Sequence, residues 1–151
     1  MYRTMAIVFA LAVSPSLLLA DDKEEAAKNE LKKFQGDWKA VKSEDDGRAA
    51  TRGDPIIVEG DKLSLVIRDR ITFVGKIKLN PTADPKTIDW EYTEGPGGVV
   101  GKVQRGIYRW DGDKLEVCWN PVGTKERPKK FTTKPSAGKG FQYRLYEKKK
   151  E

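Results

Sequence analysis

Carboxylates are the side chains of this sequence best suited to chemistry, because the chain contains no histidine at all. The absence of histidine excludes Ser-His-Asp and Cys-His catalysis and zinc sites of the HExxH type. The acids of interest occur at residues 44–46, at Asp89 and Glu91, and at Asp111 and Asp113. Two carboxylates can hydrolyse a glycosidic bond only when both point into one site. A carboxylate-dependent hydrolase is therefore one alternative function.

The spacing of these acids argues against such a site. Asp89 and Glu91 alternate with Trp90, so they are expected on the outer face of a strand. Asp111 and Asp113 lie in a glycine turn and lack the further oxygen ligands of a calcium loop. Residues 44–46 are expected to form a solvated loop. We therefore predict a protein that is not an enzyme, with no catalytic, metal-binding or cofactor-binding residues and no cofactor.

Cys118 is the single cysteine, so no disulfide can form within the chain. It lies in KLEVCWN, a segment with the pattern of a strand. We expect a buried structural thiol, because no histidine is available to activate it as a nucleophile.

The first twenty residues have the layout of a secretory signal peptide. Arg3 precedes an uncharged apolar segment at residues 5–20, and DDKEE follows directly. We expect cleavage after Ala20, although Leu18 is large for its position, and an uncleaved anchor is the alternative. This predicts export to the periplasm or the extracellular space, with no stable membrane insertion after cleavage.

The remaining chain predicts one short helix followed by strands. Residues 21–33 are rich in helix formers and carry a narrow apolar stripe of Ala27, Leu31 and Phe34. From Trp38 onward apolar and polar residues alternate, which indicates antiparallel strands with one dry face. About eight strands are expected, near 38–43, 56–59, 62–68, 70–79, 87–93, 103–110, 114–120 and 140–147, and a ninth is conceivable near 128–133.

With no helices between the strands, the prediction is an all-β protein with an antiparallel up-and-down barrel. The barrel domain is expected at residues 34–147, followed by a basic tail at 148–151. In the last strand, Phe141, Tyr143 and Leu145 are expected to face inward.

Gly36 and Trp38 stand at the start of the first strand, after the helix. This arrangement is similar to the G-x-W opening of lipocalins, in which the indole closes one end of the barrel beside a late arginine. The resemblance implies that Gly36, Trp38 and Arg144 form the structural closure, with Arg144 stacked on the indole.

Five stretches carry a closer resemblance: LKKFQGDWKAV, VEGDKL, KLNPTADPKTIDW, GIYRWDGDKLEVCWN and ERPKKFTTKP. They resemble the uncharacterised lipocalin-like domain family that is abundant, often as exported proteins, in planctomycete bacteria. The resemblance covers about residues 31–146. It implies the fold and export, and it adds no ligand or catalytic residue.

The inward aromatic residues leave two interpretations open: they fill a small barrel, or they line a ligand cavity. The predicted lining residues are Phe73, Trp90, Tyr92, Trp119, Phe131 and Tyr143. The second interpretation makes the protein a binder of a small apolar or amphipathic molecule, or a module for interactions in the cell envelope.

The net charge of the chain indicates which kinds of partner it could bind. The chain has a formal net charge of +6, with basic clusters at Lys32 and Lys33, in KERPKK at 125–130 and at the C-terminus. Acids are interspersed among them, so we expect a solvated surface, a monomer and no nucleic-acid partner. A surface that binds polyanions or glycans is an alternative, and the sequence identifies no protein partner.

Overall fold

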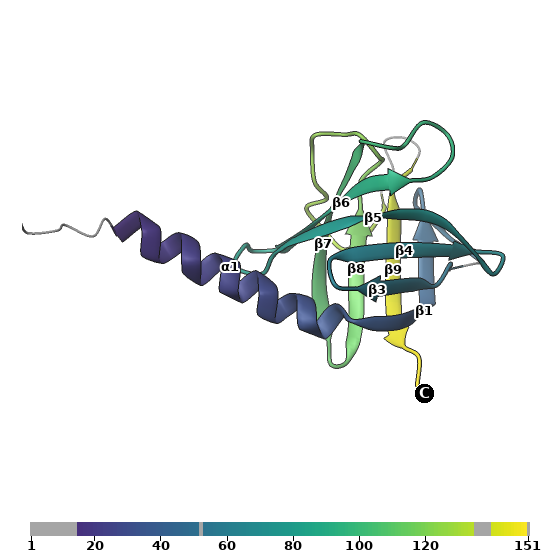
Figure 1. Cartoon of the computed structure of the whole chain (residues 1–151). Coiled ribbons are helices and arrows are strands. Elements are labelled where there is room, and N and C mark those ends of the chain that lie inside the picture. The colour runs from purple at the N-terminus through teal and green to yellow at the C-terminus, as the bar shows by residue number, and fades with distance from the viewer. Residues whose placement is uncertain (1–14, 52, 135–139, 151) are drawn as a thin grey trace, which may run out of the picture.

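The protein is a closed β-barrel with one helix at its end (Figure 1). A computed structural model describes residues 15–51, 53–134 and 140–150. Nine strands form one antiparallel sheet in the order β2-β1-β3-β4-β5-β6-β7-β8-β9, and pairing of β1 with β9 closes it. The elements are α1 (Pro15–Phe34), β1 (Gly36–Asp45), β2 (Arg48–Ala49), β3 (Ile56–Glu59), β4 (Lys62–Ile67), β5 (Arg70–Asn80), β6 (Lys86–Glu94), β7 (Val103–Asp111), β8 (Lys114–Trp119) and β9 (Gln142–Lys148).

The predicted fold class is confirmed, and every expected main strand is present. The ninth strand suggested near 128–133 is wrong, because those residues form bends and irregular backbone. The additional strand is instead the two-residue β2, which pairs with the end of β1. The tight turns expected at EGDK and DGDK are also present, and Gly60 and Gly112 both adopt a positive φ of 61° there.

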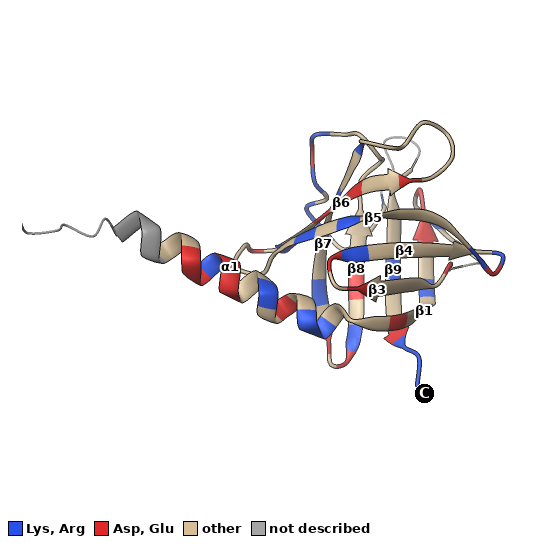
Figure 2. Ribbon diagram, in the orientation of Figure 1, with Lys and Arg blue, Asp and Glu red and all other residues tan. Residues whose placement is uncertain are grey.

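Helix α1 begins at Pro15, six residues before its predicted start, and therefore runs through the predicted cleavage point after Ala20. It projects from one end of the barrel (Figure 1), and acidic and basic residues follow one another between Asp21 and Lys33 (Figure 2). None of the helices in the described ranges combines the length and the hydropathy needed to cross a membrane. The rest of the expected signal peptide, residues 1–14, lies outside the described residues.

The helix is joined to the barrel by a sharp corner. Phe34 ends the helix and is fully buried, and Gly36 begins β1 with a φ of 111°. That conformation suits glycine, because other side chains rarely adopt a positive φ. The predicted role of Gly36 at the corner between helix and strand agrees with this geometry.

A second apolar layer lies outside the barrel wall. Alternation along β7, β8 and β9 turns Ile107, Cys118 and Tyr143 outward, where Phe131 covers them. Phe131 belongs to the long connection between β8 and β9, which packs across this part of the wall. Consequently these three strands bury apolar residues on both faces.

The basic tail at the C-terminal end of the chain is part of the fold. Strand β9 continues to Lys148, and the backbone amide of Lys149 donates a hydrogen bond of 2.8 Å to the Asp37 carbonyl. Lys148 and Lys149 of the tail are therefore paired with β1.

Candidate functional site

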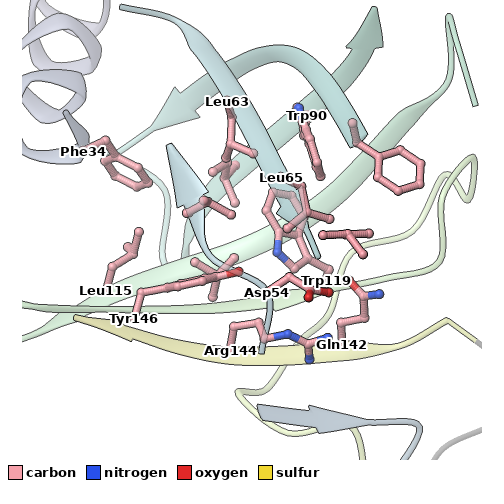
Figure 3. Close-up of a pocket in the computed structure, with 15 residues that line it drawn as sticks. Phe34, Asp54, Leu63, Leu65, Trp90, Leu115, Trp119, Gln142, Arg144 and Tyr146 are labelled. Carbon is pink, nitrogen blue, oxygen red and sulfur yellow. The ribbon is translucent and has the colours of Figure 1, made fainter. Parts of the chain in front are cut away.

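The barrel encloses a cavity of about 180 Å³ (Figure 3). Eleven of the fifteen lining residues are apolar, and the polar side chains come from Asp54, Gln142, Arg144 and Tyr146. The apolar lining residues are Phe34, Ile56, Leu63, Leu65, Ile67, Phe73, Ile88, Trp90, Leu115, Val117 and Trp119. An apolar cavity with a few convergent polar groups is the usual form of a small-molecule site.

One end of the cavity is sealed by the helix. The ring of Phe34 meets the rings of Tyr108 and Trp110 edge to face, with centroids 5.1 and 5.3 Å away. Trp38 packs beside Trp110, and its indole nitrogen donates a 2.7 Å hydrogen bond to the Phe34 carbonyl. We call these four residues with Glu30 the sealed end.

Glu30 holds the helix to this end through a buried carboxylate. Its Oε1 accepts hydrogen bonds from Lys86 at 3.0 Å, Trp110 at 2.8 Å and Tyr108 at 3.3 Å, and its Oε2 accepts one from Lys33 at 3.0 Å. Burial by itself would raise the pKa of Glu30, but the hydrogen bonds from Lys86, Trp110 and Lys33 outweigh it and lower the pKa to about 2. The carboxylate is therefore ionised at neutral pH.

The opposite end of the cavity, which we call the rim, is bounded by Asp54, Ile67, Gln142 and Arg144. The Arg144 side chain is 11% exposed. Its Nη1 donates to Asp45 Oδ1 at 2.5 Å, to the Glu44 carbonyl at 3.2 Å and to the Tyr143 carbonyl at 2.9 Å. These bonds fix the guanidinium in place at the cavity wall.

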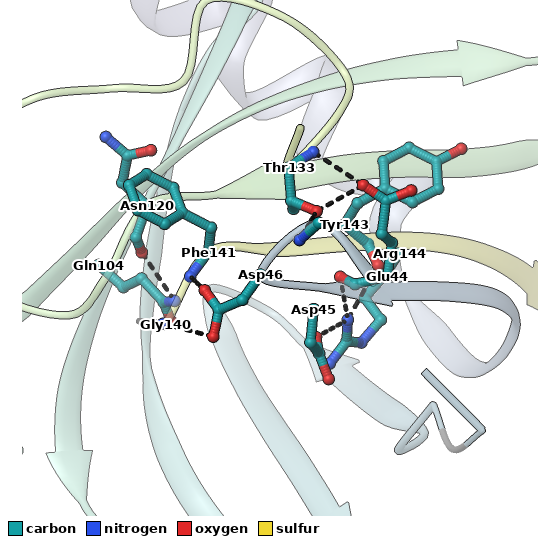
Figure 4. A network of polar contacts seen from close by, with 11 residues as sticks. Glu44, Asp45, Asp46, Gln104, Asn120, Thr133, Gly140, Phe141, Tyr143 and Arg144 are labelled. Carbon is teal, nitrogen blue, oxygen red and sulfur yellow. Dashed lines mark hydrogen bonds and ion pairs between the residues drawn. The ribbon is translucent and has the colours of Figure 1, made fainter. Parts of the chain in front are cut away.

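The acidic cluster of residues 44–46 is not the solvated loop that the sequence suggested. Figure 4 shows that Glu44 and Asp46 hold the connection between β8 and β9. Glu44 accepts hydrogen bonds from the Thr133 amide and hydroxyl at 3.0 and 2.5 Å. Asp46 accepts from the amides of Gly140 and Phe141 at 3.1 and 2.9 Å. The cluster thus fastens this connection beside the rim.

Of the predicted lining residues, Phe73, Trp90 and Trp119 do line the cavity. The indole of Trp90 fits because Gly75 has no side chain: a Cβ there would lie 2.5 Å from the indole nitrogen. Tyr92 is buried behind Trp90, with ring centroids 4.3 Å apart, and is not part of the lining. Its hydroxyl donates a 2.6 Å hydrogen bond to Gln104 Oε1.

The prediction that Phe131 and Tyr143 line the cavity is wrong. Both lie in the outer apolar layer, where the Tyr143 hydroxyl donates a 2.7 Å hydrogen bond to Glu116. The sequence pattern predicted the wrong set of alternate residues for the inward face of β9. A shift of one residue along a strand moves every side chain to the other face. The sequence pattern missed two cavity residues on this strand, Gln142 and Tyr146. Arg144 also lines the cavity, although it was predicted to close the barrel beside Trp38.

The predicted stack of Arg144 on Trp38 is also wrong. Trp38 is paired with Lys148 on β9, whereas Arg144 is paired with Ser43. Five residues of strand place those levels about 16 Å apart. The cation over the Trp38 ring is the Lys148 ammonium, 5.2 Å from its centroid.

The remaining candidate groups lie outside the cavity. Cys118 is buried in the outer layer, and burial raises the pKa of its thiol to about 11. Asp89 pairs with Arg127 at 2.7 Å on the outer face, and Glu91 is exposed, as expected from their alternation with Trp90. Among the residues that the structure describes, no three acidic, cysteine or histidine side chains gather to hold a metal ion.

Comparison of the chain with protein-family models, with curated proteins and with solved structures finds no match. The resemblance to a planctomycete lipocalin-like family therefore stays a prediction.

Proposed function

We propose that the protein is an exported, non-enzymatic barrel that binds a small amphipathic molecule in its cavity. The observation that carries the proposal is the cavity itself, which combines an apolar lining with the polar side chains of Asp54, Gln142, Arg144 and Tyr146. Its volume of about 180 Å³ is comparable to the engineered cavity of roughly 150 Å³ that binds benzene. We therefore expect a ligand about as large as one aromatic ring with a short substituent.

Entry at the rim is supported by a hollow on the outside of the barrel. Asp54 and Ile67 line both the cavity and this hollow, whose other borders are Arg68, Arg70 and Thr72. At the sealed end the buried side chains of Glu30 and Phe34 block a similar route. A ligand that enters at the rim would place its apolar part against the apolar lining and its polar part near Arg144 at the entrance or near Tyr146 deeper in the barrel.

The carboxylate-dependent hydrolase receives no support from this geometry. It needs two acids that converge inside the barrel. In the described part of the chain, Asp54 is the only acid that lines the cavity. The glycan-binding alternative remains a prediction for the exposed basic residues Lys125, Lys129 and Lys130.

The binding proposal is tested by titrating isotope-labelled protein with benzyl alcohol and following its NMR spectrum. Weak dissociation constants, on the order of 1 mM, are expected for a ligand of so few atoms. The largest shifts should occur at Leu65, Val117 and Trp119, which line the cavity. Shifts confined to surface residues would contradict the proposal.

A variant that fills the cavity can be compared with a variant that makes the same kind of change on the outer surface. Val117 is buried and lines the cavity, whereas Ile71 is 58% exposed on the outside of β5. Val117→Phe should weaken binding at least tenfold, and Ile71→Phe, which makes the same kind of change outside, should leave it unaltered. Equal affinity in the two variants would place the binding site outside the barrel.

A further inference from the structure

The inner face of β9 carries polar groups at three levels of the cavity. Gln142, Arg144 and Tyr146 are alternate residues of this strand, and all three line the cavity (Figure 3). The inward residues of β4, which are Leu63, Leu65 and Ile67, are apolar by contrast. The wall is therefore chemically asymmetric: one strand can form hydrogen bonds with a ligand, and much of the remainder can only pack against it.

Tyr146 is the deepest of the three polar residues. It is 4% exposed, and its hydroxyl points into the cavity (Figure 3). None of the hydrogen bonds among the described residues involves this hydroxyl, which faces the cavity, and a second unpaired donor is the buried Trp90 indole nitrogen. Burial raises the pKa of Tyr146 to about 12, so the group is a neutral donor at physiological pH.

The charges at the rim oppose each other. The guanidinium of Arg144 is paired with Asp45, and Asp54 adds a second carboxylate at the cavity edge. A negatively charged ligand group would lie near Asp54, and a positively charged one would lie near Arg144. A neutral polar group is repelled by neither of these charges, and it can accept a hydrogen bond from the donors on β9.

We propose that the β9 face selects small ring or chain compounds that bear one neutral oxygen group, such as an alcohol, a carbonyl or an amide. The oxygen accepts a hydrogen bond from Tyr146 or Arg144, while the apolar part packs against the pair of indoles formed by Trp90 and Trp119. This inference rests on the proposed function, since it names the class of ligand for the same cavity.

Four compounds with the same ring test the selectivity: toluene, benzyl alcohol, benzoate and benzylammonium. Each is titrated into the full-length protein at pH 7 and followed by NMR. We expect benzyl alcohol to bind roughly tenfold more tightly than toluene, because one hydrogen bond to an otherwise unpaired buried group is gained. Benzoate and benzylammonium should each bind at least fivefold more weakly than benzyl alcohol.

Two substitutions in β9 show which side chain causes the preference for benzyl alcohol. Tyr146→Phe should reduce the affinity for benzyl alcohol to that for toluene and leave toluene binding within twofold of the wild type. Tyr143→Phe removes a hydroxyl from the outer face of β9 and should keep the full preference for benzyl alcohol. If Tyr146→Phe does not fold, Arg144→Met in the wild-type background tests the other donor by the same ratio.

The outcomes separate the two proposals. Equal affinities for toluene and benzyl alcohol would overturn selection by β9 and leave cavity binding intact. Tightest binding of benzoate would overturn the preference for a neutral group. Failure of all four compounds to bind would overturn the proposed function as well.

Discussion

The two ends of the barrel use polar groups in opposite ways. At the sealed end, Glu30 is surrounded by four donors, one of which is the Trp110 nitrogen, and the Trp38 nitrogen is hydrogen-bonded to the Phe34 carbonyl. At the rim, Arg144 is bonded through one nitrogen only, and deeper in the cavity the Tyr146 hydroxyl takes part in none of the hydrogen bonds among the described residues. The difference is consistent with a first end that maintains the fold, and it supports the proposal that a ligand binds in the cavity between the two ends.

The largest effect is expected from the sealed end. Trp38 is 2% exposed, and Trp38→Ala should lower the free energy of unfolding by about 3–5 kcal/mol, as large truncations in a core do. Chemical denaturation measures this loss. At the rim, Ile67→Ala should cost less than about 2 kcal/mol because Ile67 is only partly buried. A loss under 1 kcal/mol for Trp38→Ala would mean that the indole does not stabilise the closed end.

Replacing Glu30 should have the next largest effect, and the effect should depend on pH. Because its pKa falls to about 2 on folding, Glu30 stabilises the protein fully above its unfolded pKa of 4.5, and this contribution disappears as the pH falls toward 2. Glu30→Gln should therefore cost about 2–3 kcal/mol at pH 7. Unfolding curves at pH 7 and at pH 2.5 measure the change.

The contribution of Glu30 is refuted if the two proteins differ equally at both pH values. Glu24 supplies the control, because it lies on the same helix and is solvent exposed. Glu24→Gln should change stability by less than about 0.5 kcal/mol at pH 7.

Loosening the connection beside the rim should have a smaller effect. Asp46→Ala removes the acceptor for two backbone amides, so a loss of about 1–2 kcal/mol is expected. Hydrogen exchange should accelerate at the amides of Gly140 and Phe141 and remain unchanged at Trp38. Acceleration across the whole barrel would show that the rim and the sealed end unfold as one unit.

The smallest effect concerns the cation over Trp38. Lys148→Met should cost about 0.5–1 kcal/mol, because the site is exposed on one side. A double-mutant cycle with Trp38→Phe measures the coupling between the two side chains. Coupling of Trp38 to Arg144 instead of Lys148 would restore the arrangement that the sequence suggested.

Alternation along the chain was sufficient to predict the barrel, because most strands have one apolar and one polar face. It failed in β9, where Phe141, Tyr143 and Leu145 compete with Gln142, Arg144 and Tyr146 for the inward face. Tyr143 is buried on the outer face because Phe131, in the connection between β8 and β9, packs against its cluster, and that packing is not part of the alternation along β9. A local pattern contains no information about such a cover.

The same limit explains the errors at Arg144 and in the acidic cluster. The partners of Arg144 are fixed by the pairing of β1 with β9, which brings it beside Ser43 and Asp45 rather than Trp38. Glu44 and Asp46 accept hydrogen bonds from a segment that lies about 90 residues later in the chain. One-residue differences in register decide these contacts, and composition does not reveal them.

The most direct test of the central claim is a crystal structure of the protein grown with benzyl alcohol. We expect the ring inside the barrel, packed against the pair of indoles formed by Trp90 and Trp119, with its oxygen within hydrogen-bond distance of Tyr146 or Arg144. A ligand bound only on the outside of the barrel, with side chains filling the cavity, would contradict the assignment of the interior as a binding site.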